Sequence, residues 1–377
     1  MARPPSSLMS LAFALALLLT LLQAHCASAS AASGVSSAGG TSGTSVEAAR
    51  QPLRLEGPSR KPYTFAVYAN ADLGQLPSHV RQAVLILHGV KRNADDYFAI
   101  GQHLLTMAGL AASDNLLLAP NFMAHKDRGV LPGMPVWGGG AWMQGEPSAR
   151  GVTGVTSFQV LDDLLRWLGD PRRFPDLREI VLIGHSAGAQ LLQRYTVLNA
   201  VTEELQQTGI HVRYVISSPS SYLYLSPERP LGDGFAIPTR QMQACPRYDD
   251  YRYGLQHAPA YLPPPQLDGR QLFARYAARD VRYMVGARDT DPQHRYLDHA
   301  CGAAMQGQTR VARQLAYVGS EHDLSQRWQI PVDHPQRQIP GAAHGAARLF
   351  GAPEAVQWIF PTPSGAARRE SAGSRLP

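Results

Sequence analysis

Residues 179–195 read EIVLIGHSAGAQLLQRY, which places an apolar run, a turn of small residues and an amphipathic run in direct succession. The first part, EIVLI, favours a strand because aliphatic and β-branched side chains dominate it. The last part, AQLLQRY, favours a helix. The stretch therefore predicts a strand, a sharp turn and a helix, with Ser186 at the apex of the turn.

Crowding at such a turn explains its glycines. Where a strand passes directly into a helix the two backbones approach closely, and only very small side chains at Gly184 and Gly188 let them pass. Ser186, between His185 and Ala187, is then forced outward. The pattern Gly-x-Ser-x-Gly in this setting resembles the nucleophile elbow of the α/β-hydrolase superfamily. The resemblance implies that Ser186 is a nucleophile; the alternative is a helix-capping serine.

Short apolar runs with the composition of strands recur along the chain. These runs are residues 63–68, 83–87, 115–118, 179–183, 212–216 and 281–285. Stretches with helical spacing, such as 158–168 and 190–201, lie between several of them. The alternation predicts an α/β fold with a mostly parallel central sheet, helices on both faces and a site at the carboxyl ends of the strands. A stretch rich in Tyr and Pro, about 217–267, predicts an insertion after the elbow.

His88, Gly89 and Val90 follow one of the earlier predicted strands. They resemble the His-Gly turn at which the superfamily builds half of its oxyanion hole, where two fixed N–H donors stabilise a developing negative charge. The resemblance assigns these donors to the backbone N–H groups of Val90 and Ala187. Taken alone, His88 and Gly89 are equally a structural turn with a core histidine. The stretch 88–94 is also similar to poorly characterised secreted members, which implies no particular substrate.

The superfamily places its acidic residue after a later strand, shortly beyond a glycine turn. Residues 283–289, YMVGARD, match this layout, so the resemblance assigns the acid to Asp289. Its task would be to orient the histidine and to stabilise the imidazolium formed during attack. Asp291 is the alternative, whereas Asp280 precedes the strand and would lie at its wrong end. The alternative for Asp289 is an aspartate that only stabilises a turn.

Residues 339–344, IPGAAH, have the pattern of a short last strand that ends in a loop, with a helix starting near Ala346. This segment resembles the histidine loop of the superfamily and implies that His344 is the base. His322, which has acidic neighbours, is the competitor. The order Ser186, Asp289, His344 along the chain is the order that the superfamily uses.

The sequence indicates the type of reaction more clearly than it indicates the substrate. Trp137, Trp142 and Tyr222 are candidates for a pocket because flat rings give a large contact area, and the two tryptophans are equally candidates for the core. No long apolar lid is evident, which favours small or polymeric ester substrates of some polarity. We therefore expect a serine hydrolase of the carboxylesterase type, with a non-catalytic binding protein, a peptidase or an acyltransferase as alternatives.

The first residues have the pattern of a secretion signal, since Arg3 precedes an apolar run from Leu8 to Leu22 and small residues follow it. We predict a signal peptide at 1–31, a flexible Ser/Gly/Ala-rich leader at 32–50, the hydrolase domain at 51–360 and a disordered tail at 361–377. This predicts a secreted or periplasmic protein without a membrane span in the mature chain. An uncleaved N-terminal membrane anchor is the alternative.

The cysteines, the net charge and the absence of certain motifs bear on a disulfide and on possible partners and cofactors. Cys245 and Cys301 are the two cysteines outside the predicted signal, and export predicts that they form a disulfide; two free buried thiols are the alternative. The net charge of +6 is spread along the chain without basic runs, which argues against nucleic acid as a partner. No nucleotide fingerprint or zinc spacing occurs, and His294 and His299 do not form a convincing metal set, so we expect no cofactor and no metal.

Overall fold

The structure is a computed structural model that describes residues 50–57, 61–77, 79–259, 261 and 267–361. These residues all lie in the unit Thr44–Pro377. The predicted signal peptide falls outside the described residues, as do the leader and the tail apart from Arg50 and Pro361. None of the described helices has the length and hydropathy needed to cross a membrane.

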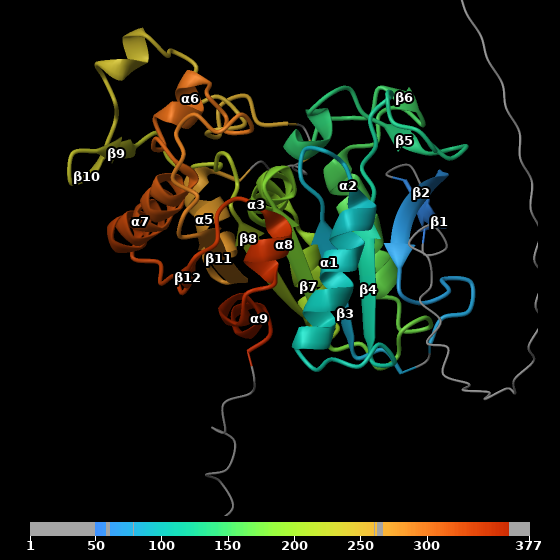
Figure 1. Ribbon diagram of the computed structural model, residues 1–377. Coiled ribbons are helices and arrows are strands. Elements are labelled where there is room, and N and C mark those ends of the chain that lie inside the picture. Colours follow the sequence, from blue (N-terminus) through green and yellow to red (C-terminus); the bar gives the residue numbers. More distant parts are fainter. Residues whose placement is uncertain (1–49, 58–60, 78, 260, 262–266, 362–377) are drawn as a thin grey trace, which may run out of the picture. The chain divides into compact units, whose positions relative to one another are not determined.

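Eight strands form the central sheet, in the spatial order β1-β2-β4-β3-β7-β8-β11-β12 (Figure 1). Their bounds are β1 Arg50–Glu56, β2 Pro62–Ala69, β3 Gln82–Leu87, β4 Asn115–Pro120, β7 Glu179–His185, β8 His211–Ser217, β11 Asp280–Gly286 and β12 Gln336–Ile339. Neighbours from β4 to β12 run parallel, whereas β1 and β2 are antiparallel to the strands beside them. The prediction of a mostly parallel sheet is confirmed.

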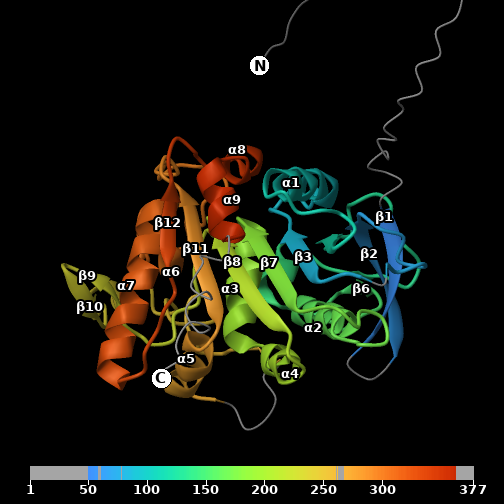
Figure 2. The ribbon, with the colours of Figure 1, turned by 90° about the horizontal axis from the view of Figure 1, so that it is seen from below.

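Helices cover both faces of this sheet (Figure 2). One face packs against α1 Ala94–Met107, α8 Ala346–Phe350 and α9 Pro353–Ile359. The opposite face packs against α2 Ser157–Leu168, α3 Ala187–Leu198, α4 Val201–Gln207, α5 Gly269–Ala277 and α7 Arg310–Trp328. The prediction of an α/β fold with helices on both faces is therefore confirmed.

The central strands read as continuous apolar runs because both of their faces are buried. In β3 the side chains of Val84 and Ile86 belong to the core under α1, while Leu85 and Leu87 belong to the core on the other face. This alternation follows from the pleat of a strand, which points successive side chains to opposite faces. All six predicted strand runs coincide with strands of the sheet.

The edge strand β1 was not predicted from the sequence. Its residues, RQPLRLE, bury only Leu53 and Leu55, and Pro52 interrupts its polar pattern. An edge strand pairs on one side alone and therefore tolerates a proline and exposed arginines. A sequence pattern that searches for buried runs does not detect such a strand.

Helix α2, which precedes the elbow, has residues at both ends that favour the end of a helix. Thr156 accepts a hydrogen bond from the N–H of Gln159, and the side chain of Gln159 accepts one from the N–H of Thr156, which together form a capping box. The helix ends at Leu168, directly before Gly169. Its apolar face packs into the same core as the elbow helix α3.

The predicted insertion after the elbow lies between β8 and α5. It contains the hairpin β9 Arg229–Leu231 and β10 Gly234–Ala236, which packs beside α7 (Figure 1), and the short 3-10 helix η3 Gln241–Gln243. The buried side chain of Arg229 holds the segment together, because it donates hydrogen bonds to the carbonyl oxygens of Tyr248 and Tyr253 and to the carboxylate of Asp249.

A disulfide fixes this insertion to a distant part of the chain. Cys245 lies in the insertion and Cys301 opens the short helix α6 Cys301–Ala304, and the two are bonded across a sequence separation of 56. The pairing predicted from the cysteine count is present. The remaining short elements of the described chain are β5 Pro135–Val136, β6 Arg150–Gly151 and the 3-10 helix η2 Ala141–Gln144.

Asp162 is a buried carboxyl group on the inner face of α2. It accepts hydrogen bonds from the hydroxyl groups of Tyr195, at 2.8 Å, and of Tyr261, at 2.8 and 2.9 Å. Burial nevertheless dominates and raises the pKa of Asp162 to about 7. The charged form is therefore less favourable in the folded protein than in the unfolded chain.

We expect this carboxyl to make the folded protein less stable as the pH rises from about 4, where the unfolded chain loses its proton, to about 7. Below this pH range the stabilisation by the protonated carboxyl group of Asp162 is fully present, and above the range this stabilisation is lost. Asp162→Asn removes the titration. The unfolding free energy of the variant relative to the parent protein should therefore rise across the window, by an amount on the order of 3 kcal/mol. Denaturant titrations at pH 4 and pH 8 measure this; a difference that stays constant with pH would contradict it.

Candidate active site

The strand order brings together side chains from three distant parts of the chain. Ser186 directly follows β7, Asp289 lies just beyond β11, and His344 lies just beyond β12. Because these strands are parallel, their carboxyl ends meet at the same edge of the sheet. The three residues that the sequence singled out are therefore neighbours.

Ser186 occupies the sharp turn predicted between β7 and α3. Its backbone has φ 56° and ψ −115°, a conformation that residues with a side chain rarely adopt. A Cβ atom at Gly184 would lie 2.6 Å from the carbonyl oxygen of Gly188, and one at Gly188 would lie 2.6 Å from the carbonyl oxygens of Leu87 and His88. Close backbone contact on both sides of the serine thus requires the two glycines.

A chain of hydrogen bonds connects Ser186, His344 and Asp289. The Oγ atom of Ser186 lies 3.0 Å from Nε2 of His344, and Nδ1 of His344 lies 2.8 Å from Oδ2 of Asp289. An ionised carboxylate only accepts hydrogen bonds, so Nδ1 carries the proton of the neutral ring and Nε2 is free to accept from the serine. Ser186 keeps 6% of its surface exposed.

The competing residues lie elsewhere. Asp291 is exposed and accepts a hydrogen bond from the backbone N–H of Gln293. His322 is exposed on α7. Asp280 begins β11, at the end away from Ser186, and pairs with Arg213. Of the acidic and histidine candidates, His344 is thus the one that contacts the serine, and Asp289 is the one that contacts His344.

A buried arginine that the sequence did not point to completes the surroundings of Asp289. The Nη1 atom of Arg310 lies 3.3 Å from Oδ1 of Asp289, and both side chains are almost completely buried. Burial alone would raise the pKa of Asp289, but the hydrogen bond from His344 and the charge of Arg310 outweigh burial and hold this pKa below its usual value. The carboxylate is therefore ionised, and its two oxygens serve different partners.

Two further histidines flank the ring of His344. The ring centroids of His185 and His294 each lie 4.9 Å from that of His344. Burial, followed by the nearby charges of His344 and Arg310, lowers the pKa of His185 well below its usual value, and burial lowers that of His294. Both neighbours are therefore uncharged near neutral pH. Tyr97 of α1 holds His185 by a hydrogen bond of 2.7 Å between its hydroxyl group and Nδ1.

The turn after β3 lies beside the serine. Burial lowers the pKa of His88 to about 4, so its ring is neutral, and it donates from Nδ1 to the carbonyl oxygen of Gly89 while Nε2 accepts from the N–H of Phe122. A Cβ atom at Gly89 would lie 3.8 Å from that of Ser186, so the turn lies in van der Waals range of the serine. In the described part of the chain the backbone N–H groups of Val90 and Ala187 donate to no carbonyl oxygen or side chain.

The aromatic side chains proposed for a substrate pocket belong instead to the core. Trp137, Trp142 and Tyr222 are completely buried. Trp142 stacks on Phe122, and Tyr222 stacks on Tyr317. Neither cleft at Ser186 is lined by them. The pocket assignment was wrong, and for the two tryptophans the alternative position in the core is the one observed, because aromatic rings are equally typical of a packed core.

Two clefts meet at Ser186. The main cleft has a volume of about 690 Å³ and extends from the serine over the turn after β3, the start of α1 and the loop of His344. The side cleft, of about 270 Å³, extends toward Met143, Gln190 and Leu297. Four residues line both clefts, namely Val90, Ser186, Arg295 and Tyr296. The serine thus has room on two sides.

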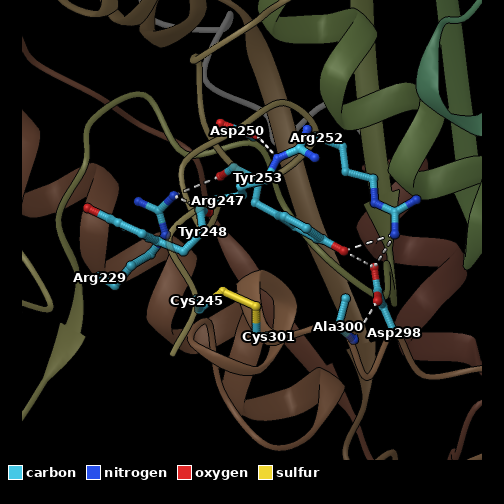
Figure 3. Close-up of a disulfide and its surroundings, with 10 residues drawn as sticks. All are labelled: Arg229, Cys245, Arg247, Tyr248, Asp250, Arg252, Tyr253, Asp298, Ala300 and Cys301. Atoms are coloured by element: carbon cyan, nitrogen blue, oxygen red, sulfur yellow. Dashed lines mark hydrogen bonds and ion pairs between the residues drawn. A yellow bond between two sulfur atoms is a disulfide. The ribbon is translucent and has the colours of Figure 1, made fainter. Parts of the chain in front are cut away.

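The wall of the side cleft is held by polar contacts next to the disulfide (Figure 3). Asp298 lies 3.4 Å from Nη2 of Arg252 and accepts hydrogen bonds from the hydroxyl group of Tyr253 and from the N–H of Ala300. Ala300 directly precedes Cys301. Among the described residues, no group of three or more His, Cys, Asp or Glu side chains is placed to hold a metal ion.

Comparison with known proteins identifies the fold. No protein-family model and no curated protein matches the sequence. Among solved structures, the LpqC poly(3-hydroxybutyrate) depolymerase from Bordetella parapertussis superposes with a TM-score of 0.56 at 19% identity, covering 84% of this chain and 92% of that chain. Poly(aspartic acid) hydrolase-1 from Sphingomonas sp. KT-1 gives 0.55 at 18%, covering 82% and 98%. The fold is that of the α/β-hydrolases, as the elbow motif implied.

Removal of the guanidinium beside Asp289 should destabilise the protein. In Arg310→Met the carboxylate stays buried with the hydrogen bond from His344 but without its cationic partner, and we expect the free energy of unfolding to fall by about 3 kcal/mol. Asp289→Asn in the same chain removes the uncompensated charge, so the double variant should recover part of this loss. Denaturant unfolding of the parent, both single variants and the double variant gives the coupling. Strictly additive losses would show that the two groups do not interact.

Proposed function

We propose that this chain is a serine hydrolase that cleaves carboxylic esters through an acyl-enzyme on Ser186. The hydrogen-bonded chain from Ser186 through His344 to Asp289 is the observation that carries the proposal. Its geometry meets the two requirements of an activated serine, namely a base within hydrogen-bond reach and a carboxylate that orients this base. The clefts on both sides of the serine give space to the acyl and alcohol parts of an ester.

In the first step the Oγ atom of Ser186 attacks the carbonyl carbon of the ester while Nε2 of His344 takes the hydroxyl proton. The resulting imidazolium is stabilised by the carboxylate of Asp289, whose lowered pKa keeps it charged. Collapse of the tetrahedral intermediate breaks the bond to the alcohol oxygen. His344 returns its proton to this oxygen, and the alcohol leaves.

In the second step water attacks the acyl-enzyme. His344 takes a proton from this water molecule, and the new tetrahedral intermediate releases the carboxylic acid and regenerates the serine. The flanking rings of His185 and His294 favour these proton transfers, because uncharged neighbours do not oppose the transient positive charge on His344.

The negative charge on the carbonyl oxygen needs donors in both steps. We assign these donors to the backbone N–H groups of Val90 and Ala187. Val90 lines both clefts beside Ser186, and Ala187 is the first residue of α3, where N–H groups have no partner within the helix. The hydrogen bond from His88 to the carbonyl oxygen of Gly89 fixes the turn that carries Val90.

The two solved structures named above are a depolymerase of poly(3-hydroxybutyrate) and a hydrolase of poly(aspartic acid). Cleavage of an acyl bond is common to both names, which agrees with the reaction proposed for this chain. A small or polymeric ester fits the open clefts. The disulfide between Cys245 and Cys301 supports export to an oxidising compartment, as proposed from the first residues of the sequence.

Ser186→Ala should abolish the reaction without loss of the fold. We expect hydrolysis of 4-nitrophenyl acetate to fall by at least about three orders of magnitude, because the variant lacks the nucleophile. Labelling by a fluorophosphonate probe should disappear with it. Ser113→Ala, which changes an exposed serine, is the matched control and should keep both signals. Undiminished turnover in Ser186→Ala would reject the mechanism, and a parent protein that neither reacts with the probe nor cleaves esters would reject the proposed function.

Asp289→Asn tests the role of the acid. The amide cannot stabilise the imidazolium and favours the wrong tautomer of His344, so kcat should fall by about three to four orders of magnitude while KM changes little. Asp291→Asn is the matched control, since this exposed carboxylate lies two residues further on and does not contact His344. Equal losses in the two variants would contradict the assignment.

A further inference from the structure

The clefts at Ser186 have an uneven charge. Four cationic side chains line them, namely Lys91, Arg252, Arg295 and Arg348. Only two acidic side chains do so, Asp96 in the main cleft and Asp298 in the side cleft. A cleft lined by an excess of one sign of charge concentrates ligands of the opposite sign.

Both acidic side chains already have partners in the structure. Asp298 lies 3.4 Å from the guanidinium of Arg252 and accepts a hydrogen bond of 2.9 Å from the hydroxyl group of Tyr253 (Figure 3). Asp96 accepts a hydrogen bond of 2.5 Å from the side-chain amide of Asn93. Asp298 thus pairs with Arg252, whereas Asp96 bonds to a neutral amide and forms no ion pair within the described residues, so the main cleft keeps three cations against one acidic side chain.

The other three cations have no acidic partner within the described residues. Lys91, Arg295 and Arg348 are exposed and form no ion pair there. The guanidinium of Arg295 lies 4.5 Å from the ring centroid of Tyr296, and these two residues line both clefts. Arg295 is therefore placed to meet either part of an ester bound at Ser186.

The remaining wall of the main cleft is largely apolar. Small and aliphatic side chains such as Ala99, Ile100, Ala346 and Ala347 line it. An aliphatic chain fits such a wall, while a carboxylate at the end of that chain would meet the unpaired cations. A guanidinium matches a carboxylate particularly well because its planar fork can donate two parallel hydrogen bonds.

We propose that the substrate is an ester that carries a free carboxylate, and that Arg295 binds this carboxylate with help from Lys91 and Arg348. The proposal rests on the hydrolase function proposed above and narrows its substrate class to anionic esters, such as the half-esters of dicarboxylic acids or oligomers of hydroxy acids that end in a carboxylate. Arg295 acts here as a binding residue and takes no part in proton transfer.

A matched pair of substrates tests the proposal. The acyl groups of 4-nitrophenyl hydrogen adipate and 4-nitrophenyl hexanoate have the same number of carbons and differ in a terminal carboxylate in place of a methyl group. For the full chain with its disulfide, kcat/KM for the adipate should exceed that for the hexanoate by roughly fivefold at low ionic strength. The preference should decrease as salt is added, because exposed charges are screened.

Variants of Arg295 test whether its guanidinium causes the preference for the adipate. In Arg295→Gln the ratio of kcat/KM for the adipate to kcat/KM for the hexanoate should fall toward one, and in Arg295→Glu it should fall further, to below one. Arg54→Gln is the matched control. Arg54 is an exposed arginine of β1 that lines neither cleft, so its variant should keep the preference.

The outcomes separate this proposal from the hydrolase function. Turnover of the hexanoate equal to or above that of the adipate in the parent protein would overturn the anionic substrate and leave the hydrolase function intact. An adipate preference that persists unchanged in Arg295→Glu would overturn the role of Arg295. Absence of turnover for both esters, together with absence of labelling by the fluorophosphonate probe, would overturn both proposals.

Discussion

Close backbone contact at the turn after β7 is the constraint on which the site depends. Gly188 lies so near the carbonyl oxygens of Leu87 and His88 that the first turn of α3 contacts the end of β3 directly. This contact brings the start of α3 next to the turn after β3. The unusual backbone conformation of the serine persists because buried strands and helices surround it on both faces. The geometry of the site is thus a consequence of packing.

Electrostatics adds a second layer to this arrangement. Asp289 is buried together with a cation, so it stays charged in a place where an isolated carboxyl would take up a proton. His344, by contrast, lies between two neutral rings. The site therefore combines the buried ion pair of Asp289 and Arg310 with an imidazole whose two neighbouring rings are neutral.

The parts that follow from local patterns were predictable from the sequence. The strand runs and the elbow depend on neighbouring residues, and the order of Ser186, Asp289 and His344 was given by the resemblance of short motifs. Contacts between distant segments were not predictable. Arg310 is 21 residues from Asp289 and belongs to no motif, and Tyr97 reaches His185 from a helix 88 residues earlier in the chain. The sequence left the two tryptophans open between a pocket and the core for the same reason, since a ring's position depends on the segment that packs against it, and the structure places both in the core.

The disulfide has a consequence for how the molecule would respond to its surroundings. Neither cysteine belongs to the central sheet, yet their bond joins the insertion after β8 to the segment that ends with Asp298 and Ala300, beside the side cleft. Loss of this bond in a reducing medium would leave both hydrophobic cores with all of their strands. The loosened part would be the wall of the side cleft at Ser186, so a break in a bond outside the central sheet would be felt first beside the serine.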